Sequence, residues 1–278
     1  MRNENSWIEW GGEGRIVHFA HANGFPPLSY RDLLTPLTSD FTMVSWEARP
    51  LWPGAGPEQI QGWEDLAQDL VETLRSRGMN GIIGIGHSLG GVLSLMAAVR
   101  APELFSALVL LDPVLFSGMR ALVWRMMKAT GRSQRMPLYD GAMRRRDQWP
   151  DRETVAETWS NRSIFAKWQA SALDAYVENG VFDDPGNGVR LRYPKAWEAR
   201  IFELTPHDVW ADVKKVEIPI LALRGEFSDT YMRGAHRRLR RVAQHARCEE
   251  VAGAGHMFPM EKPGEISRRI RDFLVSCR

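Results

Sequence analysis

A serine flanked by glycines follows a short apolar run, and this stretch limits the possible folds of the chain more than any other. The apolar run at 82–85 leads into Gly86-His87-Ser88-Leu89-Gly90-Gly91, and small apolar residues follow at 92–98. This order predicts a strand, a sharp turn with the serine at its apex, and a helix. Glycine on both sides of the serine allows a strained turn and close packing of the helix on the strand.

Ser88 is the candidate nucleophile. At the apex of this turn its hydroxyl lies beside the N-terminus of the predicted helix, where backbone N–H groups favour negative charge. We therefore expect the N–H of Leu89 to donate to an oxyanion. A second donor should come from the loop after the strand predicted at 15–20, and Phe25, between Gly24 and Pro26, is the candidate.

A serine nucleophile needs a base and a carboxylate that orients the base. A strand, turn and helix with a serine at the apex is called a nucleophile elbow. In proteins that use one, the three catalytic residues follow the chain order serine, then Asp or Glu, then His. Among the seven histidines, His256 has the right setting, because it follows the last predicted strand in a glycine-containing loop at 252–259. We expect His256 to be the base.

Two aspartates compete for the acid position, and each follows a predicted strand. Asp229 lies in the loop at 225–230, and Asp112 lies directly before Pro113. The first loop is longer and more pliable, so we predict that Asp229 orients His256 and that Asp112 orders its own loop. Glu226 is a third candidate.

Short apolar runs alternate with helical patterns along most of the chain. This alternation predicts an α/β fold with a mostly parallel sheet covered by helices on both faces. Ligands of such sheets lie at the carboxyl ends of the strands, and each candidate residue follows a strand. The expected strands are at 15–20, 41–46, 82–85, 107–111, 218–225 and 248–253, with helices at 28–37, 63–77 and 263–274.

The segment at 115–212 interrupts the alternation and is helical in pattern. We predict a helical cap here, inserted into a core formed by 1–114 and 213–278. The cap is rich in tryptophan and methionine, which could line a pocket for an apolar substrate or form the core of the cap itself. Its tryptophans are Trp124, Trp149, Trp159, Trp168, Trp197 and Trp210.

Composition excludes several other classes of protein. The 36 Lys and Arg residues nearly balance 34 Asp and Glu residues, so no overall field attracts nucleic acid or an anionic membrane. We expect the basic runs at 144–146 and 237–241 to be solvated faces. Cys248 and Cys277 form neither a disulfide framework nor a metal motif. Without an apolar leader or a membrane-length run, the expected location is cytoplasmic.

The chain resembles the α/β-hydrolase superfamily with a cap domain, which includes esterases, lipases and C–C hydrolases. The resemblance implies a serine hydrolase that cleaves carboxylic esters of small to medium apolar substrates through an acyl-enzyme, with no cofactor and no metal. A C–C hydrolase, a lactonase, a thioesterase or a binding receptor of the same fold stays open, as does the oligomeric state. In one departure, Ala22-Asn23 stands where many members have His-Gly. The matching segments are 21–26, 86–91, 110–113, 225–229 and 253–256.

Overall fold

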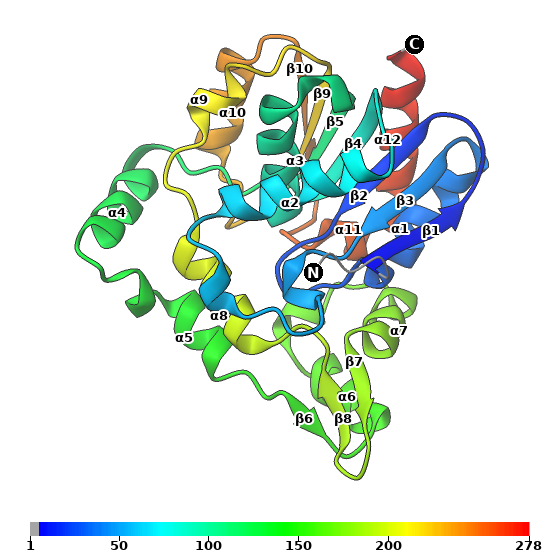
Figure 1. Ribbon diagram of the computed structural model, residues 1–278, viewed down its shortest axis with the longest axis vertical. Helices are drawn as coiled ribbons and strands as arrows, with labels where there is room; N and C mark the ends of the chain where they lie inside the picture. The colour runs from blue at the N-terminus through cyan, green and yellow to red at the C-terminus, as the bar shows by residue number, and fades with distance from the viewer. Residues whose placement is uncertain (1–5, 278) are drawn as a thin grey trace.

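A seven-stranded sheet forms the centre of the computed structural model, which describes residues 6–277 (Figure 1). Its strand order is β1-β3-β2-β4-β5-β9-β10, and within the described residues every neighbouring pair is parallel except β1 with β3. The predicted parallel sheet is thus confirmed, while the antiparallel edge strand β1 was not predicted. The strands are β1 (Trp7–Gly11), β2 (Ile16–Ala20), β3 (Thr42–Trp46), β4 (Ile82–His87), β5 (Phe105–Leu111), β9 (Ile220–Gly225) and β10 (Ala246–Val251).

Both faces of this sheet are buried, which explains why its central strands are apolar throughout. On β4, for example, Ile83 and Ile85 pack into one core and Ile82 packs into the other. The first core also contains α1 (Arg31–Leu34), α11 (Phe258–Glu261) and α12 (Pro263–Ser276). The second contains α2 (Trp63–Ser76), α3 (Leu89–Arg100) and α10 (Arg233–Val242).

Helix α2 shows how the sequence pattern produces an element. Its apolar residues recur with helical spacing and are buried, namely Leu66, Ala67, Leu70, Val71 and Leu74. At its start the Asp65 carboxylate accepts the N–H groups of Gln61 (2.7 Å) and Gly62 (3.2 Å). These bonds satisfy donors near the helix N-terminus, where negative charge is also favourable.

The segment between β5 and β9 forms a second layer, drawn in green to yellow in Figure 1. It is not purely helical as predicted, because three short strands form an antiparallel sheet in the order β6-β8-β7. Its elements are α4 (Gly118–Ala129), α5 (Pro137–Met143), β6 (Gln148–Trp149), α6 (Arg152–Ser160), α7 (Ala170–Asn179), β7 (Val181–Asp184), β8 (Gly188–Leu191), α8 (Lys195–Leu204) and α9 (Trp210–Val213).

The tryptophans of this segment are buried and serve its packing. Trp159 stacks on Tyr176 with ring centroids 4.3 Å apart, and Phe165 meets Trp168 edge-on at 4.8 Å. All six are at most 9 % exposed. The sequence allowed these tryptophans either to line a substrate pocket or to form the core of the segment, and their burial favours the core.

The remaining connections contain short 3-10 helices. Within the described part of the chain, no helix has both the length and the apolar composition that crossing a membrane requires. The 3-10 helices are η2 (Pro27–Tyr30), η3 (Thr35–Ser39), η4 (Arg49–Leu51), η5 (Pro57–Gln59), η6 (Pro102–Leu104), η7 (Ser133–Arg135) and η8 (Ser163–Phe165).

Three histidines on or directly after β2 and β4 are buried. Burial lowers the pKa of His18 to about 3 and that of His21 to about 4, and it holds the pKa of His87 well below its usual value. The cause is chiefly loss of water around the charged ring. Among the described residues neither ring nitrogen of His18 finds a hydrogen-bond partner, and the ring stacks on Trp7 at 5.8 Å.

These buried rings predict a loss of stability in acid. The unfolded chain takes up a proton on each histidine as pH falls through 6.5, whereas native His18 and His21 do so only near pH 3 and 4. The free energy of unfolding should therefore fall from pH 6.5 to about 4, by about 1.4 kcal/mol per pH unit for each histidine. His18→Phe keeps the ring stack and should flatten this slope by one such increment in urea titrations from pH 7 to 5. An unchanged slope would contradict the assignment.

Candidate active site

Ser88 lies at the turn between β4 and α3 in a strained conformation, with φ +53°. Few non-glycine residues adopt this region, and here the surrounding packing enforces it. A Cβ on Gly86 would lie 2.3 Å from the carbonyl carbon of Gly90, and a Cβ on Gly90 would lie 2.1 Å from the carbonyl oxygen of Ala20. The end of β2, the end of β4 and the start of α3 therefore meet at backbone distance. The glycine pattern predicts the close packing of α3 on β4, whereas the contact with β2 was not predicted.

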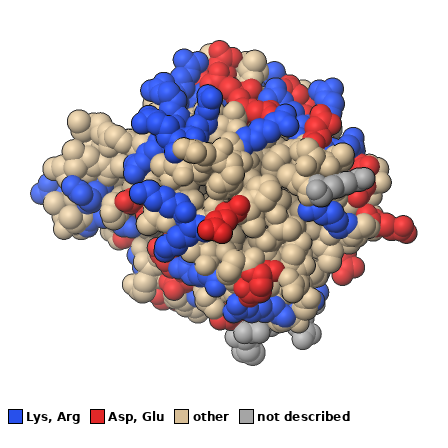
Figure 2. All heavy atoms as spheres, turned by 90° about the horizontal axis from the view of Figure 1, so that it is seen from above, with Lys and Arg blue, Asp and Glu red and all other residues tan. Residues whose placement is uncertain are grey.

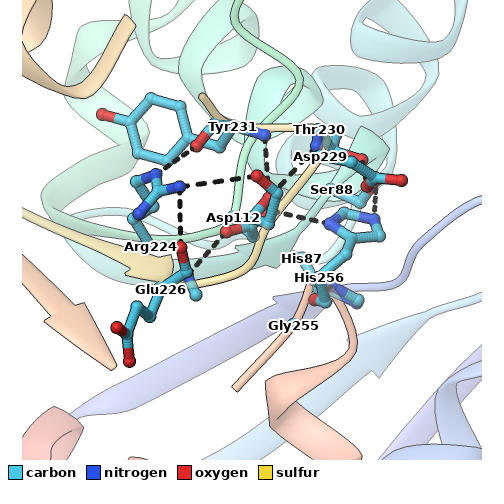
Figure 3. A network of polar contacts seen from close by, with 12 residues as sticks. His87, Ser88, Asp112, Arg224, Glu226, Asp229, Thr230, Tyr231, Gly255 and His256 are labelled. Atoms are coloured by element: carbon cyan, nitrogen blue, oxygen red, sulfur yellow. Dashed lines mark hydrogen bonds and ion pairs between the residues drawn. The ribbon is translucent and has the colours of Figure 1, made fainter. Parts of the chain in front are cut away.

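The His256 ring lies between the Ser88 hydroxyl and the carboxylate of Asp112 (Figure 3). Its Nε2 is 3.1 Å from Ser88 Oγ, and its Nδ1 is 2.7 Å from Asp112 Oδ2. The sheet register brings these groups together, because His87 at the end of β4 pairs with Leu111 at the end of β5. Ser88 directly follows β4 and Asp112 directly follows β5, so the two residues lie side by side at the ends of neighbouring strands.

The Asp112 carboxylate is completely buried and receives three hydrogen bonds. The donors are the backbone N–H of Gly225 (2.9 Å), the Ser228 hydroxyl and His256 Nδ1. An ionised carboxylate only accepts, so Nδ1 carries the imidazole proton and Nε2 is free to accept from Ser88. This is the tautomer that a general base for serine requires.

The expectation for Asp229 needs correction. Its side chain is exposed and accepts a bond from Thr230 Oγ1 (3.2 Å), while its backbone carbonyl accepts from Arg120. Glu226 faces elsewhere too, since its carboxylate accepts the N–H of Gly253 at 2.7 Å. The physical reason is strand order: β5 adjoins β4, whereas the loop with Asp229 follows β9, one strand farther away.

The loop after β9 is firmly held, contrary to the pliability that favoured Asp229. The buried guanidinium of Arg224 donates to the carbonyls of Tyr231 (2.7 Å) and Glu226 (3.1 Å) and pairs with the Glu250 carboxylate (2.5 Å). Ser228 Oγ also accepts the N–H of Tyr231 at 3.0 Å. The loop therefore presents the Ser228 hydroxyl to Asp112, and not the carboxylate of Asp229.

His87 connects two loops of the site, and its two ring nitrogens bond to groups other than the Ser88 hydroxyl. Its Nε2 lies 3.1 Å from the backbone carbonyl of His256, and its Nδ1 lies 2.8 Å from the Tyr30 hydroxyl. A carbonyl can only accept, so Nε2 carries the proton and Nδ1 accepts from Tyr30. The Tyr30 oxygen in turn accepts the N–H of Ala22 (3.3 Å). Neutral His87 thereby links the loop after β2 to the loop of His256.

The two backbone donors that the sequence suggested have different surroundings. Leu89 is the first residue of α3, a position whose N–H has no acceptor within its own helix. The N–H of Phe25 instead donates to the Ala22 carbonyl at 3.3 Å, near the long limit for a hydrogen bond. Donation from Phe25 to a ligand would therefore require sharing or replacing this bond.

Side chains of the inserted segment hold the loop that contains Phe25. Tyr176 donates to the carbonyl of Gly24 (3.0 Å), and Asn23 donates to the carbonyl of Glu198 (3.0 Å). Arg145 joins them by reaching the Tyr176 hydroxyl (2.5 Å) and the Glu198 carboxylate (2.7 Å). The expectation of a solvated face at 144–146 is therefore wrong for Arg145, whose side chain is only 15 % exposed. A partly buried charge of this kind needs its partners.

Among the described residues, no group of three or more His, Cys, Asp or Glu side chains could hold a metal ion. Cys248 and Cys277 are both free, and burial raises the pKa of Cys248 to about 11. A thiol with so high a pKa is a poor nucleophile near neutral pH. Ser88 therefore remains the candidate nucleophile of the site.

Comparison with known proteins gives consistent matches. A family model described as "Alpha/beta hydrolase family" matches residues 19–269. The chain is 25% identical to "Abhydrolase domain-containing protein AFT2-1" of Alternaria alternata, over 69% of this chain and 82% of that protein. It is 23% identical to "2-(acetamidomethylene)succinate hydrolase" of Mesorhizobium japonicum, over 95% of this chain and 89% of that protein. The crystal structure of E-2-(acetamidomethylene)succinate hydrolase has the same fold, with a TM-score of 0.79 at 21% identity, covering 97% of this chain and 94% of that one.

The crowding at the turn predicts opposite effects for two glycine-to-alanine substitutions within helices. Gly90→Ala should reduce the free energy of unfolding by about 3 kcal/mol, because its Cβ would collide with backbone that cannot retreat. Gly141→Ala on α5 is the matched control, since nothing lies within 4 Å of its Cβ. It should leave the protein unchanged or stabilise it by up to about 1 kcal/mol. Urea unfolding of both variants tests this, and equal effects would contradict it.

Proposed function

Because this chain belongs to the alpha/beta hydrolase family, we propose that it is a serine hydrolase that cleaves carboxylic esters through an acyl-enzyme. One observation carries the proposal: the His256 ring contacts both the Ser88 hydroxyl (3.1 Å) and the buried Asp112 carboxylate (2.7 Å). Nucleophile, base and orienting acid are thus within proton-transfer reach.

In the first half of the reaction, Ser88 Oγ attacks the carbonyl carbon of the ester and its proton passes to His256 Nε2. The Asp112 carboxylate stabilises the imidazolium that forms without taking up its proton. Collapse of the tetrahedral intermediate breaks the bond to the alcohol oxygen, which leaves with the proton from Nε2. Water then attacks the acyl group by the same route, which releases the acid and restores Ser88.

The negative charge on the substrate oxygen would be met by backbone N–H groups. Leu89 is the first donor, and the N-terminus of α3 adds its dipole. Phe25 is the second donor, provided that its long bond to Ala22 is shared with the oxyanion or given up on binding. The Arg145–Tyr176–Gly24 contacts would keep this loop in place as charge develops.

We further propose that residues 115–212 act as a cap over a core formed by 1–114 and 213–278. The cap supplies Arg145 and Tyr176, while the core supplies every residue assigned to the chemistry. Binding and catalysis would then be divided between the two parts, with the loop of Phe25 at their junction. The substrate would be a small to medium apolar ester, since the surroundings of Phe25 are aromatic: Tyr176 lies 5.0 Å and Trp168 5.8 Å from its ring.

An ester fits these groups with the fewest additional requirements. Its leaving alcohol needs one proton, which His256 already holds after the first step. Cleavage of a C–C bond would need a further group that protonates or stabilises a carbon leaving group. Lactones and thioesters use the same steps as esters and are separated from them only by comparing substrates.

A fluorophosphonate probe tests the assignment of Ser88 directly. The wild-type protein should be labelled and should hydrolyse p-nitrophenyl esters, whereas Ser88→Ala should show neither labelling nor turnover. Ser94→Ala is a matched control, because this serine is buried on α3 away from the turn. Absence of labelling in the folded wild-type protein would favour a binding receptor of the same fold.

The choice between the two aspartates is tested by paired substitutions. Asp112→Asn should lower kcat roughly 10³- to 10⁴-fold, because the amide cannot hold His256 in the required tautomer. Asp229→Asn alters an exposed side chain and should leave kcat within about twofold of wild type. Circular dichroism and thermal unfolding confirm that each variant is folded. The reverse ranking of the two kcat values would return Asp229 to the acid position.

A further inference from the structure

Helix α4 turns an apolar stripe toward solvent. Met119, Leu122, Val123 and Met126 are all exposed, with Met119 at 73 % and Met126 at 59 %. Their spacing of three, four and seven residues places them on one face of the helix. A soluble domain usually turns such a face inward, so this orientation calls for an explanation.

The stripe faces outward because the opposite side of α4 is fastened to the rest of the molecule. Trp124 is buried and donates to the Thr205 carbonyl at 2.6 Å, and Lys128 Nζ reaches the same carbonyl at 3.1 Å. At the start of the helix, Arg120 donates to the backbone of Asp229 and lies 4.7 Å above the Phe116 ring. These contacts at both ends fix the orientation of the stripe.

The stretch of chain that carries the stripe is basic in sequence, although the chain as a whole is nearly neutral, and Asp229 and Glu203 are its acidic neighbours from elsewhere in the fold. No Asp or Glu occurs from 113 to 139, whereas this stretch contains Arg120, Arg125, Lys128, Arg132 and Arg135. In Figure 2 the lobe at the far left, where α4 lies, shows tan and blue atoms at its outer end. Helix α10 begins beside α4, since a Cβ on Gly234 would be 3.3 Å from Ser117 Oγ. At this end of α10 the exposed Arg233 lies 3.7 Å from the Glu250 carboxylate.

We propose that α4 docks this protein on an anionic lipid surface. The stripe would enter the boundary between headgroups and acyl chains, and Arg125 beside it would meet lipid phosphates, whereas Arg120 is held by the Asp229 carbonyl. The helix has 12 residues, about 18 Å, so it would lie in the plane of the surface. The active site plays no part in this binding, so an inactive variant would bind equally well.

Charge and chemistry favour lipid over other occupants. A second copy of the chain, related by twofold symmetry, would bring the same arginines together around the stripe, which is unfavourable. Nucleic acid would suit the arginines, but the four apolar side chains of the stripe include no aromatic ring on which a base could stack. An anionic bilayer accommodates both the apolar residues and the positive charge.

Co-sedimentation with vesicles tests the proposal with the Ser88→Ala variant of the 278-residue chain, which cannot hydrolyse lipid by the mechanism above. Vesicles of phosphatidylcholine mixed with phosphatidylglycerol should bind it about tenfold or more tightly than vesicles of phosphatidylcholine alone, and high salt should weaken this binding. Replacing all four stripe residues by Gln should abolish the binding, and Arg125→Gln should weaken it about fivefold. Gln keeps helix propensity high at these positions.

The matched control replaces three exposed apolar residues elsewhere, Ile164, Phe182 and Val275, by Gln and should bind vesicles like its parent. Equal binding to both vesicle types, or undiminished binding by the stripe variant, would overturn the proposal. So would sedimentation velocity showing self-association that the stripe substitutions abolish, which would assign the stripe to a second copy. A large change in kcat/KM for a water-soluble ester, caused by these substitutions in the otherwise wild-type chain, would assign it to the active site instead.

Discussion

The backbone contact between the start of α3 and the ends of β2 and β4 determines how the rest of the site is arranged. There is no room for a side chain at Gly86 or Gly90, so three segments meet with only backbone between them. This contact holds Ser88 at a positive φ and points the N-terminus of α3 toward the carboxyl edge of the sheet. The loop after β2 lies at the same edge, so a backbone N–H from 22–25 lies near the site and is a candidate oxyanion donor.

Around this contact, the polar side chains of the site are hydrogen-bonded to groups that have further hydrogen-bond partners of their own. Asp112 is fixed by donors from the loop after β9, and that loop is fixed by the guanidinium of Arg224. His256 is fixed through its carbonyl by His87, which is fixed by Tyr30. Buried polar groups are costly unless they are satisfied, so each of these contacts both orders the site and avoids a penalty. The site is therefore organised before any ligand arrives.

The inserted segment between β5 and β9 contains both buried and exposed groups of apolar side chains. Its tryptophans are packed inward, and its arginine at 145 is paired, so most of the segment is an ordinary folded layer. Helix α4 departs from this pattern by presenting methionine, leucine and valine to solvent in a stretch of sequence that contains several basic residues and no acidic ones. A chain with near-neutral total charge can still carry such a locally basic stretch, which an overall count does not reveal.

Local patterns predicted much of this structure. Apolar runs bounded by turn residues located the parallel strands, and helical spacing located α2 and α12, because these signals depend only on neighbours in the chain. The elbow at Ser88 and its partner His256 were visible for the same reason. The edge strand β1 was missed, as was the small sheet of the inserted segment. β1 and β6 pair with strands far away in sequence, so the chain carries little local signal of them. β7 and β8 instead form a local hairpin, and the glycines at 186 and 188 at its turn are a signal that was overlooked.

The sequence by itself determined which residues could do chemistry and in what order they occur, since glycine spacing and residue type set these locally. It did not determine which aspartate meets His256 or whether Arg145 is solvated, and the predictions of Asp229 and of a solvated Arg145 were wrong. Tertiary structure decided both: the register of β4 with β5 places Asp112 next to Ser88, and the folding of α7 and α8 around Arg145 encloses its charge. Reach within a loop is a local property, but distance between loops depends on strand order, which forms only when the whole sheet does.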